Sequence, residues 1–421
     1  MLTRSRIAIL TALSLSIAAA VGTAAPAASA SPASAVVRGN AHFPARASSQ
    51  LAHELDQAWQ ITRGQGVTIA VLATVVDPVT GLAGKVANGP NYAPLPGAPA
   101  TDGTVLASLI AGSGPTSTNA FGTIGRAPGA KILAEQVADL ESRGGGKYLA
   151  YGTWQDIMAR AIRYAVNHGA GVIVTLTGGD KSTAGLDSAV QYAISKNVIV
   201  LGSALVVGKG EPTPFAYPDS LPGVINVTGV TLGGLPKPQG PDTEPANNSV
   251  LVAVPDNTLA ATGPGNAPYS AWGVYSDIAW VAGTVALIKA VYPRISPAQV
   301  ARALAESASY HPSGGYNINV GFGLINPVGA LHDAAALVKH GTTAPPGSGT
   351  VSATARFGTA QPAEIDAVKH AKAKLIGFSG AIVAGLALLV LALILGRRRR
   401  RRRPVGAPPP PVGWPDLSVQ P

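Results

Sequence analysis

Short apolar runs rich in β-branched residues recur along the middle of the chain and alternate with stretches of helical periodicity. Apolar runs of this length are typical of strands that are buried on both faces. The strand runs are 67–72, 172–176, 198–201 and 224–227, and the helical stretches are 157–167, 186–195 and 297–308. Ser296 before Pro297 has the form of an N-cap followed by a first helical turn. Strand–helix–strand alternation predicts an α/β domain with a central parallel sheet.

The N-terminus has a different pattern, with an apolar run between basic and small residues. Arg4 and Arg6 precede the run 7–21, and Ala28-Ser29-Ala30 follows it. This order is typical of a secretory signal peptide with its cleavage site. An uncleaved anchor helix is the alternative. The short run and the Ala/Pro/Ser residues after it favour cleavage.

A second apolar segment, 375–395, lies near the C-terminus and carries no charge. As a helix it would span about 30 Å, which is the thickness of a membrane's hydrocarbon core. An uninterrupted run of arginines, 397–403, follows it and should stay on the cytoplasmic side. The chain is therefore predicted to cross the cell membrane once, with an extracellular N-terminal domain and a cytoplasmic C-terminal tail.

These patterns divide the chain into segments. We expect a signal peptide at 1–30, an extended leader at 31–50, the α/β domain at 51–338, a linker at 339–374, a transmembrane helix at 375–395, and an Arg-rich and Pro-rich tail at 396–421.

Composition and charge narrow the possible functions. The formal net charge is +10, but the arginine run supplies most of it and the predicted domain is nearly neutral. We therefore expect no nucleic-acid partner. The absence of cysteine excludes a disulfide scaffold, a thiolate metal site and a cysteine nucleophile. No cofactor is expected, and the sequence leaves a structural calcium ion open.

Ordered sequence blocks across 58–330 carry a family resemblance. They are 58–59 with 64–72, 102–112, 125–132, 161–170, 217–218 with 222–227, 273–283 and 321–327. The set resembles the subtilisin-like serine peptidases, or subtilases. The short leader and C-terminal membrane helix are most similar to the mycosins, which are membrane-anchored proteases associated with type VII secretion. The resemblance implies a subtilisin-like three-layer fold and a place near a secretion apparatus.

The family's catalytic positions carry other residues in this chain. Its acidic residue falls on Ala73, its histidine on Asp102, its nucleophile on Tyr275 and its oxyanion-hole asparagine on Leu205. A serine nucleophile needs an adjacent base, normally an imidazole that a carboxylate orients. The sequence therefore predicts a pseudoprotease that acts as a peptide-binding or scaffold module, with a peptide or a secretion-system protein as partner.

The segment that pairs with substrate backbone in the family falls near Leu176, Thr177 and Gly178. An extended peptide could still add a strand to a sheet edge there. A purely structural role in a secretion complex is a further alternative.

The remaining alternative is an active mycosin-like endopeptidase with an unrecognised nucleophile. A register slip of one residue would make Ser276 that nucleophile, and His168 and His311 are the histidines between Thr62 and Ala330 that could serve as its base. Neither histidine lies in a motif that a triad would use. We also hypothesise that the Tyr275 hydroxyl donates to the Asp102 carboxylate and fills the old cleft. Otherwise both side chains would face solvent.

Overall fold

The computed structural model describes residues 43–340, except 94–99, 118, 121, 138–152, 177–178, 180, 204, 208–216, 232, 235–242, 246–249, 256–257, 313–314 and 318. The predicted signal peptide, most of the leader, nearly all of the linker, the transmembrane helix 375–395 and the tail lie outside the described residues. All described residues belong to one compact unit, Met1–Gln361.

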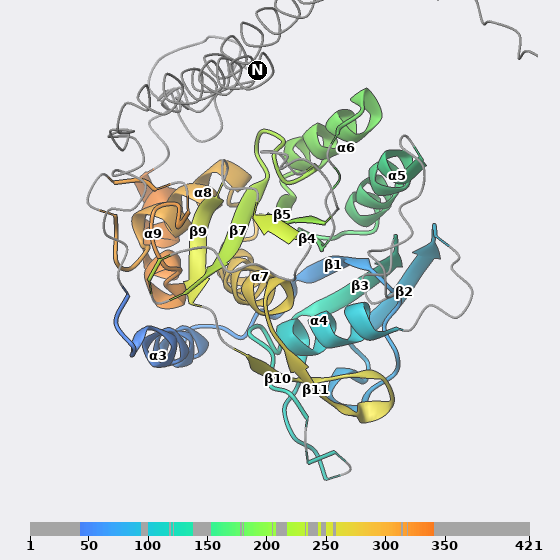
Figure 1. Ribbon diagram of the computed structural model, residues 1–421, viewed down its shortest axis with the longest axis horizontal. Helices are drawn as coiled ribbons and strands as arrows, with labels where there is room; N and C mark the ends of the chain where they lie inside the picture. The colour runs from blue at the N-terminus through green and yellow to red at the C-terminus, as the bar shows by residue number, and fades with distance from the viewer. Residues whose placement is uncertain are drawn as a thin grey trace, which may run out of the picture. The chain divides into compact units, whose positions relative to one another are not determined.

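A seven-stranded parallel sheet forms the centre of the domain, as the alternating pattern predicts (Figure 1). Its strand order is β2-β3-β1-β4-β5-β7-β9. The strands are β1 (Thr68–Ala73), β2 (Val86–Asn91), β3 (Lys131–Gln136), β4 (Val172–Thr175), β5 (Ile199–Ser203), β7 (Ile225–Val230) and β9 (Val250–Pro255). Two small antiparallel sheets pair β6 (Leu205–Val207) with β8 (Thr243–Pro245) and β10 (Leu259–Thr262) with β11 (Pro268–Ala271).

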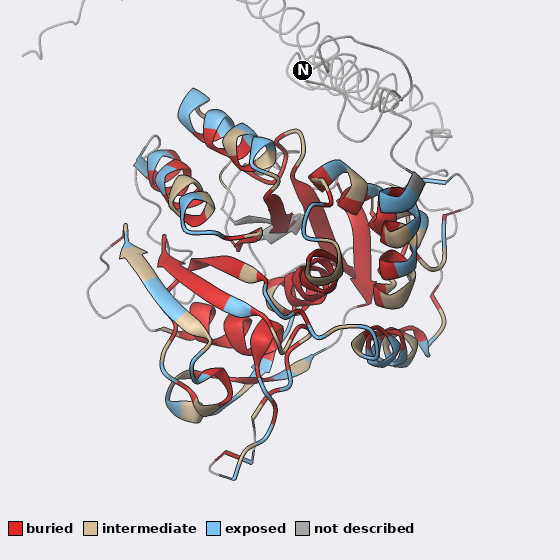
Figure 2. Ribbon diagram, turned by 180° about the vertical axis from the view of Figure 1, so that it is seen from behind, coloured by how far each residue is buried: buried red, intermediate tan, exposed pale blue. Residues whose placement is uncertain are grey.

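Helices cover both faces of the central sheet, so the predicted three-layer architecture is confirmed (Figure 2). Alternate residues of β1 explain this: Ile69 and Val71 enter one core cluster, and Ala70 and Leu72 enter the other. The first cluster includes α4 (Thr101–Ala111) and α7 (Val274–Val291), and the second includes α5 (Thr153–Asn167) and α6 (Ala184–Ser195).

The remaining helices pack on the α4 and α7 side of the sheet or beside it. They are α3 (Ala47–Trp59), α8 (Pro297–Glu306) and α9 (Pro327–His340), with single 3₁₀ turns at Thr80–Leu82 and Pro264–Asn266. The predicted cap of α8 is present, because the Ser296 hydroxyl accepts a hydrogen bond from the Gln299 backbone N–H.

Helix α3 begins at Ala47, inside the segment 31–50 that the sequence predicts to be extended. Phe43 and Ala47 are both buried in a small cluster with Val320 and Leu324. The Tyr310 hydroxyl also donates to Gln50 Oε1 at 2.6 Å. The last residues of the predicted leader are therefore part of the folded domain, because their apolar side chains have a place in its core.

Helix α7 is long and apolar enough to cross a membrane, but 83% of it is buried inside the domain. It is the central core helix on its face of the sheet, and its Trp280 is buried in the core cluster there. The helix begins at Val274, directly after Gly273, whose φ of 61° suits glycine. Tyr275 therefore lies in its first turn.

Candidate functional site

The carboxyl end of β1 lies against the start of α4. Ala73 ends the strand and is buried. The next residue, Thr74, accepts a hydrogen bond at its Oγ1 from the Gly103 backbone N–H at 2.8 Å. A Cβ atom on Gly103 would overlap the Thr74 carbonyl oxygen, so only glycine permits this close approach. The contact holds Asp102, the neighbour of Gly103, beside the end of β1.

The start of α7 meets the start of α4 through a side-chain hydrogen bond. The Tyr275 hydroxyl donates to Asp102 Oδ1, as the sequence-based hypothesis predicts. Asp102 is completely buried, so the alternative in which both side chains face solvent is wrong. The carboxylate thus accepts a hydrogen bond from a phenol, between the two positions that the family resemblance assigns to the histidine and the nucleophile.

Ser276, the fallback nucleophile, follows Tyr275 and has no exposed surface. Its Oγ atom has no hydrogen-bond partner. The two candidate bases are bonded elsewhere: His168 Nδ1 lies 2.8 Å from the Tyr164 carbonyl oxygen, and His311 Nδ1 lies 2.9 Å from that of Phe322. Within the described part of the chain, Ser276 Oγ is therefore buried and hydrogen-bonded to neither candidate histidine.

The other predicted site residues are only partly described. Leu205 begins β6, which pairs with β8 through Leu205 and Pro245. Leu176 follows β4, and its side chain is buried in the core cluster that contains α7. Thr177 and Gly178 lie outside the described residues. Just beyond them, Gly179 exchanges two backbone hydrogen bonds of 2.8 Å with Tyr217.

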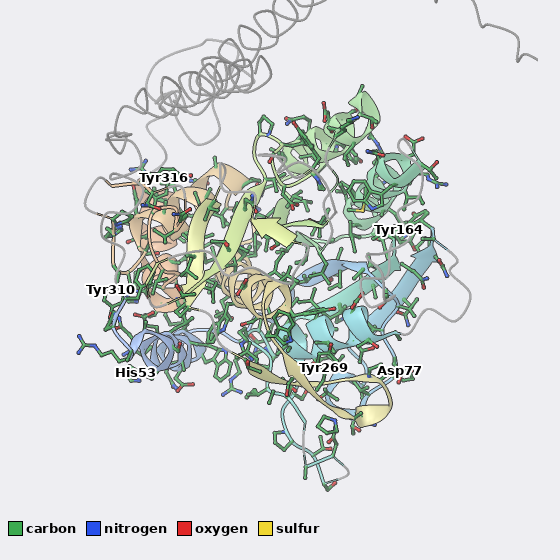
Figure 3. The ribbon with its side chains drawn as sticks, in the orientation of Figure 1. His53, Asp77, Tyr164, Tyr269, Tyr310 and Tyr316 are labelled. Atoms are coloured by element: carbon green, nitrogen blue, oxygen red, sulfur yellow. The ribbon has the colours of Figure 1, made fainter. Side chains whose placement is uncertain are left out.

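Asp77, which the sequence analysis does not place in the site, joins the β1 side to the β10–β11 hairpin (Figure 3). Its Oδ2 atom accepts a hydrogen bond from the Gly265 backbone N–H at 2.8 Å. Its own N–H donates to Thr104 Oγ1 at 2.8 Å. The residue is a turn anchor, consistent with the Asp-Pro sequence in which it lies.

Two buried carboxyl groups escaped the sequence analysis. Asp219 follows the Tyr-Pro pair of a family block and is 2% exposed. Thr175 Oγ1 donates to its Oδ1 at 3.1 Å, and burial raises the pKa of Asp219 well above its ordinary value. A Cβ atom on Gly202 would overlap this carboxyl group. The sequence signal for Asp219 is its position shortly before the apolar strand run 224–227.

Glu135 is the second such group and lies in β3. It has no exposed surface, and neither carboxyl oxygen has a hydrogen-bond partner. Its Cγ atom and Tyr164 Cε1 both lie near Gly89, at 3.1 and 3.2 Å from where a Cβ of that residue would be. Burial raises the pKa of Glu135 to about 8, so the group is mostly protonated at neutral pH.

Metal binding has little support in the described part of the chain. No group of three or more His, Cys, Asp or Glu residues there could hold a metal ion. The expectation that the protein has no cofactor stays a prediction.

Comparison with known proteins now identifies the family. Residues 64–277 match the subtilase family, peptidase S8, and this is half of the chain. The chain therefore belongs to the subtilase family. It is 29% identical to subtilisin E of Bacillus subtilis over 268 residues, which cover 62% of this chain and 65% of that protein. The chain thus spans slightly less than two thirds of this relative.

Mycosins are among the similar proteins, as the sequence analysis predicts. Mycosin-4 of Mycobacterium tuberculosis is 29% identical over 334 residues, which cover 70% of each chain. The solved structure of the serine protease MycP1, described as an essential component of the type VII (ESX-1) secretion system, is 28% identical with a TM-score of 0.54. The match covers 70% of this chain and 89% of that one. The chain is therefore a subtilisin-like peptidase homologue related to the mycosins of secretion systems.

Proposed function

We propose that the protein is a pseudoprotease, a subtilase domain that has lost hydrolysis and acts as a peptide-binding or scaffold module. The observation that carries this proposal is the hydrogen bond from the Tyr275 hydroxyl to the buried Asp102 carboxylate. Both residues lie where the family has its nucleophile and its histidine. The pair joins α4 to α7 and occupies the space in which a serine and an imidazole would have to meet.

The chemistry supports a complete rather than a partial loss. Tyr275 offers a phenol in place of a serine hydroxyl, and it donates to a carboxylate, which is a weaker base than the imidazole that normally activates a serine. In subtilisin, the type enzyme of the family, loss of the nucleophile or the histidine lowers turnover about a million-fold. Loss of the asparagine donor, which would fall on Leu205 here, costs a further factor of roughly a hundred to a thousand in that enzyme.

The alternative, an active endopeptidase with Ser276 as nucleophile, has less support. The Ser276 hydroxyl is fully buried and has no partner, and both candidate histidines are bonded to carbonyl oxygens elsewhere. A nucleophile needs both a base and a path for substrate.

We place this module outside the cell membrane, near a secretion apparatus, with a single C-terminal membrane helix and a cytoplasmic tail. The signal-peptide pattern, the apolar segment 375–395 and the arginine run 397–403 support the topology. The similarity to MycP1 supports the association with secretion. Protease protection of a C-terminal tag in intact cells tests the topology, because a cytoplasmic tag would survive protease added outside the cells.

Labelling with a fluorophosphonate probe tests the loss of catalysis. We expect the full chain to remain unlabelled under conditions in which subtilisin is labelled completely, and Ser276→Ala to behave as the unchanged chain does. Labelling that disappears in Ser276→Ala would overturn the proposal, because it would identify Ser276 as an active nucleophile.

A second experiment tests whether the three positions are those of the ancestral triad. The combined change Ala73→Asp, Asp102→His and Tyr275→Ser, with Leu205→Asn, should introduce fluorophosphonate labelling at residue 275. The same set without Tyr275→Ser is the matched control and should stay unlabelled. Labelling in both sets would argue against this assignment of the nucleophile position.

A further inference from the structure

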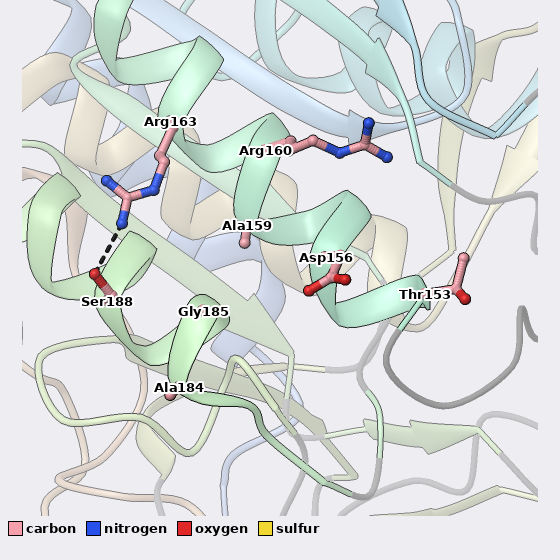
Figure 4. A pocket seen from close by; sticks show the side chains of 8 residues that line it. All are labelled: Thr153, Asp156, Ala159, Arg160, Arg163, Ala184, Gly185 and Ser188. Carbon is pink, nitrogen blue, oxygen red and sulfur yellow. Dashed lines mark hydrogen bonds between the residues drawn. The ribbon is translucent and has the colours of Figure 1, made fainter.

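A groove of about 690 Å³ runs between α5 and α6, on the opposite face of the sheet from α4 and α7 (Figure 4). Small residues, Ala159, Ala184 and Gly185, form part of its lining. The Arg163 guanidinium points from α5 toward Ser188 of α6, and that of Arg160 extends from α5 away from α6, toward Tyr92 (Figure 4). The α5 side of the groove therefore carries two guanidinium groups and one carboxylate, that of Asp156.

Both arginine side chains are held in place by aromatic rings. The Arg160 guanidinium lies 5.3 Å from the centre of the Tyr92 ring, and that of Arg163 lies 5.3 Å from the centre of the Tyr192 ring. Arg163 Nη2 also donates to Ser188 Oγ at 2.8 Å. These contacts restrict the rotamers of two long side chains, which lowers the entropy cost of binding a further group.

Neither guanidinium has an acidic partner in the described part of the chain. No carboxylate oxygen there lies within 4.0 Å of a guanidinium nitrogen of Arg160 or Arg163. Each group can therefore still accept a carboxylate in the two-point geometry that arginine favours. The two residues are three positions apart on α5, so their side chains start about 5–6 Å from each other on one helix face.

We propose that this groove docks an acidic peptide segment of a partner protein, whose carboxylates pair with Arg160 and Arg163. Charge complementarity carries the assignment, because the groove presents two unneutralised guanidinium groups above a lining of small residues. Asp156 lies in the same groove, one helical turn before Arg160. Its charge opposes a continuous polyanion along α5, and this favours a peptide with a few local carboxylates over nucleic acid or polyphosphate. The site is separate from the Tyr275–Asp102 pair and does not depend on the proposed loss of catalysis.

Fluorescence anisotropy with a labelled peptide of glycine and serine that carries two glutamates tests the proposal. The full chain is used with residues 397–403 all changed to glutamine, because that arginine run would itself bind the probe. We expect Arg160→Gln and Arg163→Gln each to weaken binding by up to roughly fivefold, which is the range for an exposed ion pair. Arg294→Gln, an exposed arginine outside the groove, is the matched control and should leave the affinity unchanged.

Asp156→Asn should tighten binding, because it removes from the groove a negative charge that repels the peptide's carboxylates. A misfolded variant would bind more weakly, so a gain in affinity cannot come from misfolding. The proposal is overturned if the peptide does not bind, if Arg294→Gln weakens binding as much as the groove variants do, or if Asp156→Asn has no effect. Equal groove-dependent affinity for polyphosphate or for phosphatidylglycerol vesicles would also overturn it, since the site would then select negative charge without selecting a peptide.

Discussion

The buried carboxyl group of Glu135 should make the stability of the domain depend on pH. Both of its oxygens are buried without hydrogen-bond partners, and burial raises its pKa from 4.5 to about 8. The folded chain therefore keeps this proton in a range where the unfolded chain has lost it. Ionisation stabilises only the unfolded state there, so the free energy of unfolding should fall as pH rises from 4.5 to about 8.

The size of the effect follows from the pKa difference. One pKa unit corresponds to 1.36 kcal/mol, so the slope is at most about 1.4 kcal/mol per pH unit and the whole interval at most roughly 5 kcal/mol. Ionisation of Glu135 would also be felt at Tyr92, because burial and then the charge of Glu135 raise the pKa of that tyrosine. Above about pH 8 the contribution of Glu135 should no longer change.

Glu135→Gln should remove this part of the pH dependence, because an amide of nearly the same shape cannot ionise. Urea denaturation followed by tryptophan fluorescence at several pH values from 5 to 8.5 measures it. We expect the variant to be close to the unchanged chain at pH 5 and more stable by several kcal/mol at pH 8.5. Asp56→Asn, at an exposed carboxylate, is the control.

The comparison isolates Glu135 from other buried acids. Asp219 has a pKa raised by burial and contributes a slope of the same sign, but it contributes equally to both proteins. The reasoning is refuted if stability follows the same pH curve with and without Glu135→Gln. Parallel curves would mean that the carboxyl group is ionised in the folded protein or reaches water.

Three further changes test buried contacts of the domain. Tyr275→Phe removes the hydroxyl that donates to Asp102 and should cost about 1–3 kcal/mol of stability in urea denaturation. Gly202→Ala places a methyl group on the Asp219 carboxyl and should cost about 1–3 kcal/mol or more; Asp219→Ala should recover part of that loss in a double-mutant cycle. Lys289→Met removes an ammonium that donates to two backbone carbonyls at 3.0 Å, and calorimetry should show a lower Tm.

The layer structure could be predicted from the sequence because each central strand is apolar on both faces. In β1, consecutive residues enter opposite core clusters, and such a continuous apolar run is a strong signal. The hydrogen bond between Tyr275 and Asp102 could also be predicted, because the ordered family blocks fix which helix starts face each other. In both cases a local pattern and a long-range arrangement agree.

Other features gave no usable signal. Glu135 lies next to Gln136 at the end of β3, and its burial without a partner depends on what packs above it. The start of α3 at Ala47 depends on a cluster with Val320 and Leu324, which lie far away in the sequence. The groove beside Arg160 exists because two helices separated by a strand are neighbours. Each depends on contacts between distant segments, and such contacts leave no periodicity in the chain.

The geometry around Asp102 shows how the starts of two helices are held in this subtilase fold. The close contact between β1 and α4 is made by the Thr74 hydroxyl and the backbone of Gly103, and neither group takes part in hydrolysis. The contact between α4 and α7 is made by the Tyr275 hydroxyl and the Asp102 carboxylate. A buried carboxylate is costly unless it accepts hydrogen bonds, and the phenol of Tyr275 supplies one. Each helix start is thus held by polar contacts among Thr74, Gly103, Asp102 and Tyr275, so we expect these contacts to keep the fold intact whether or not the domain hydrolyses peptides.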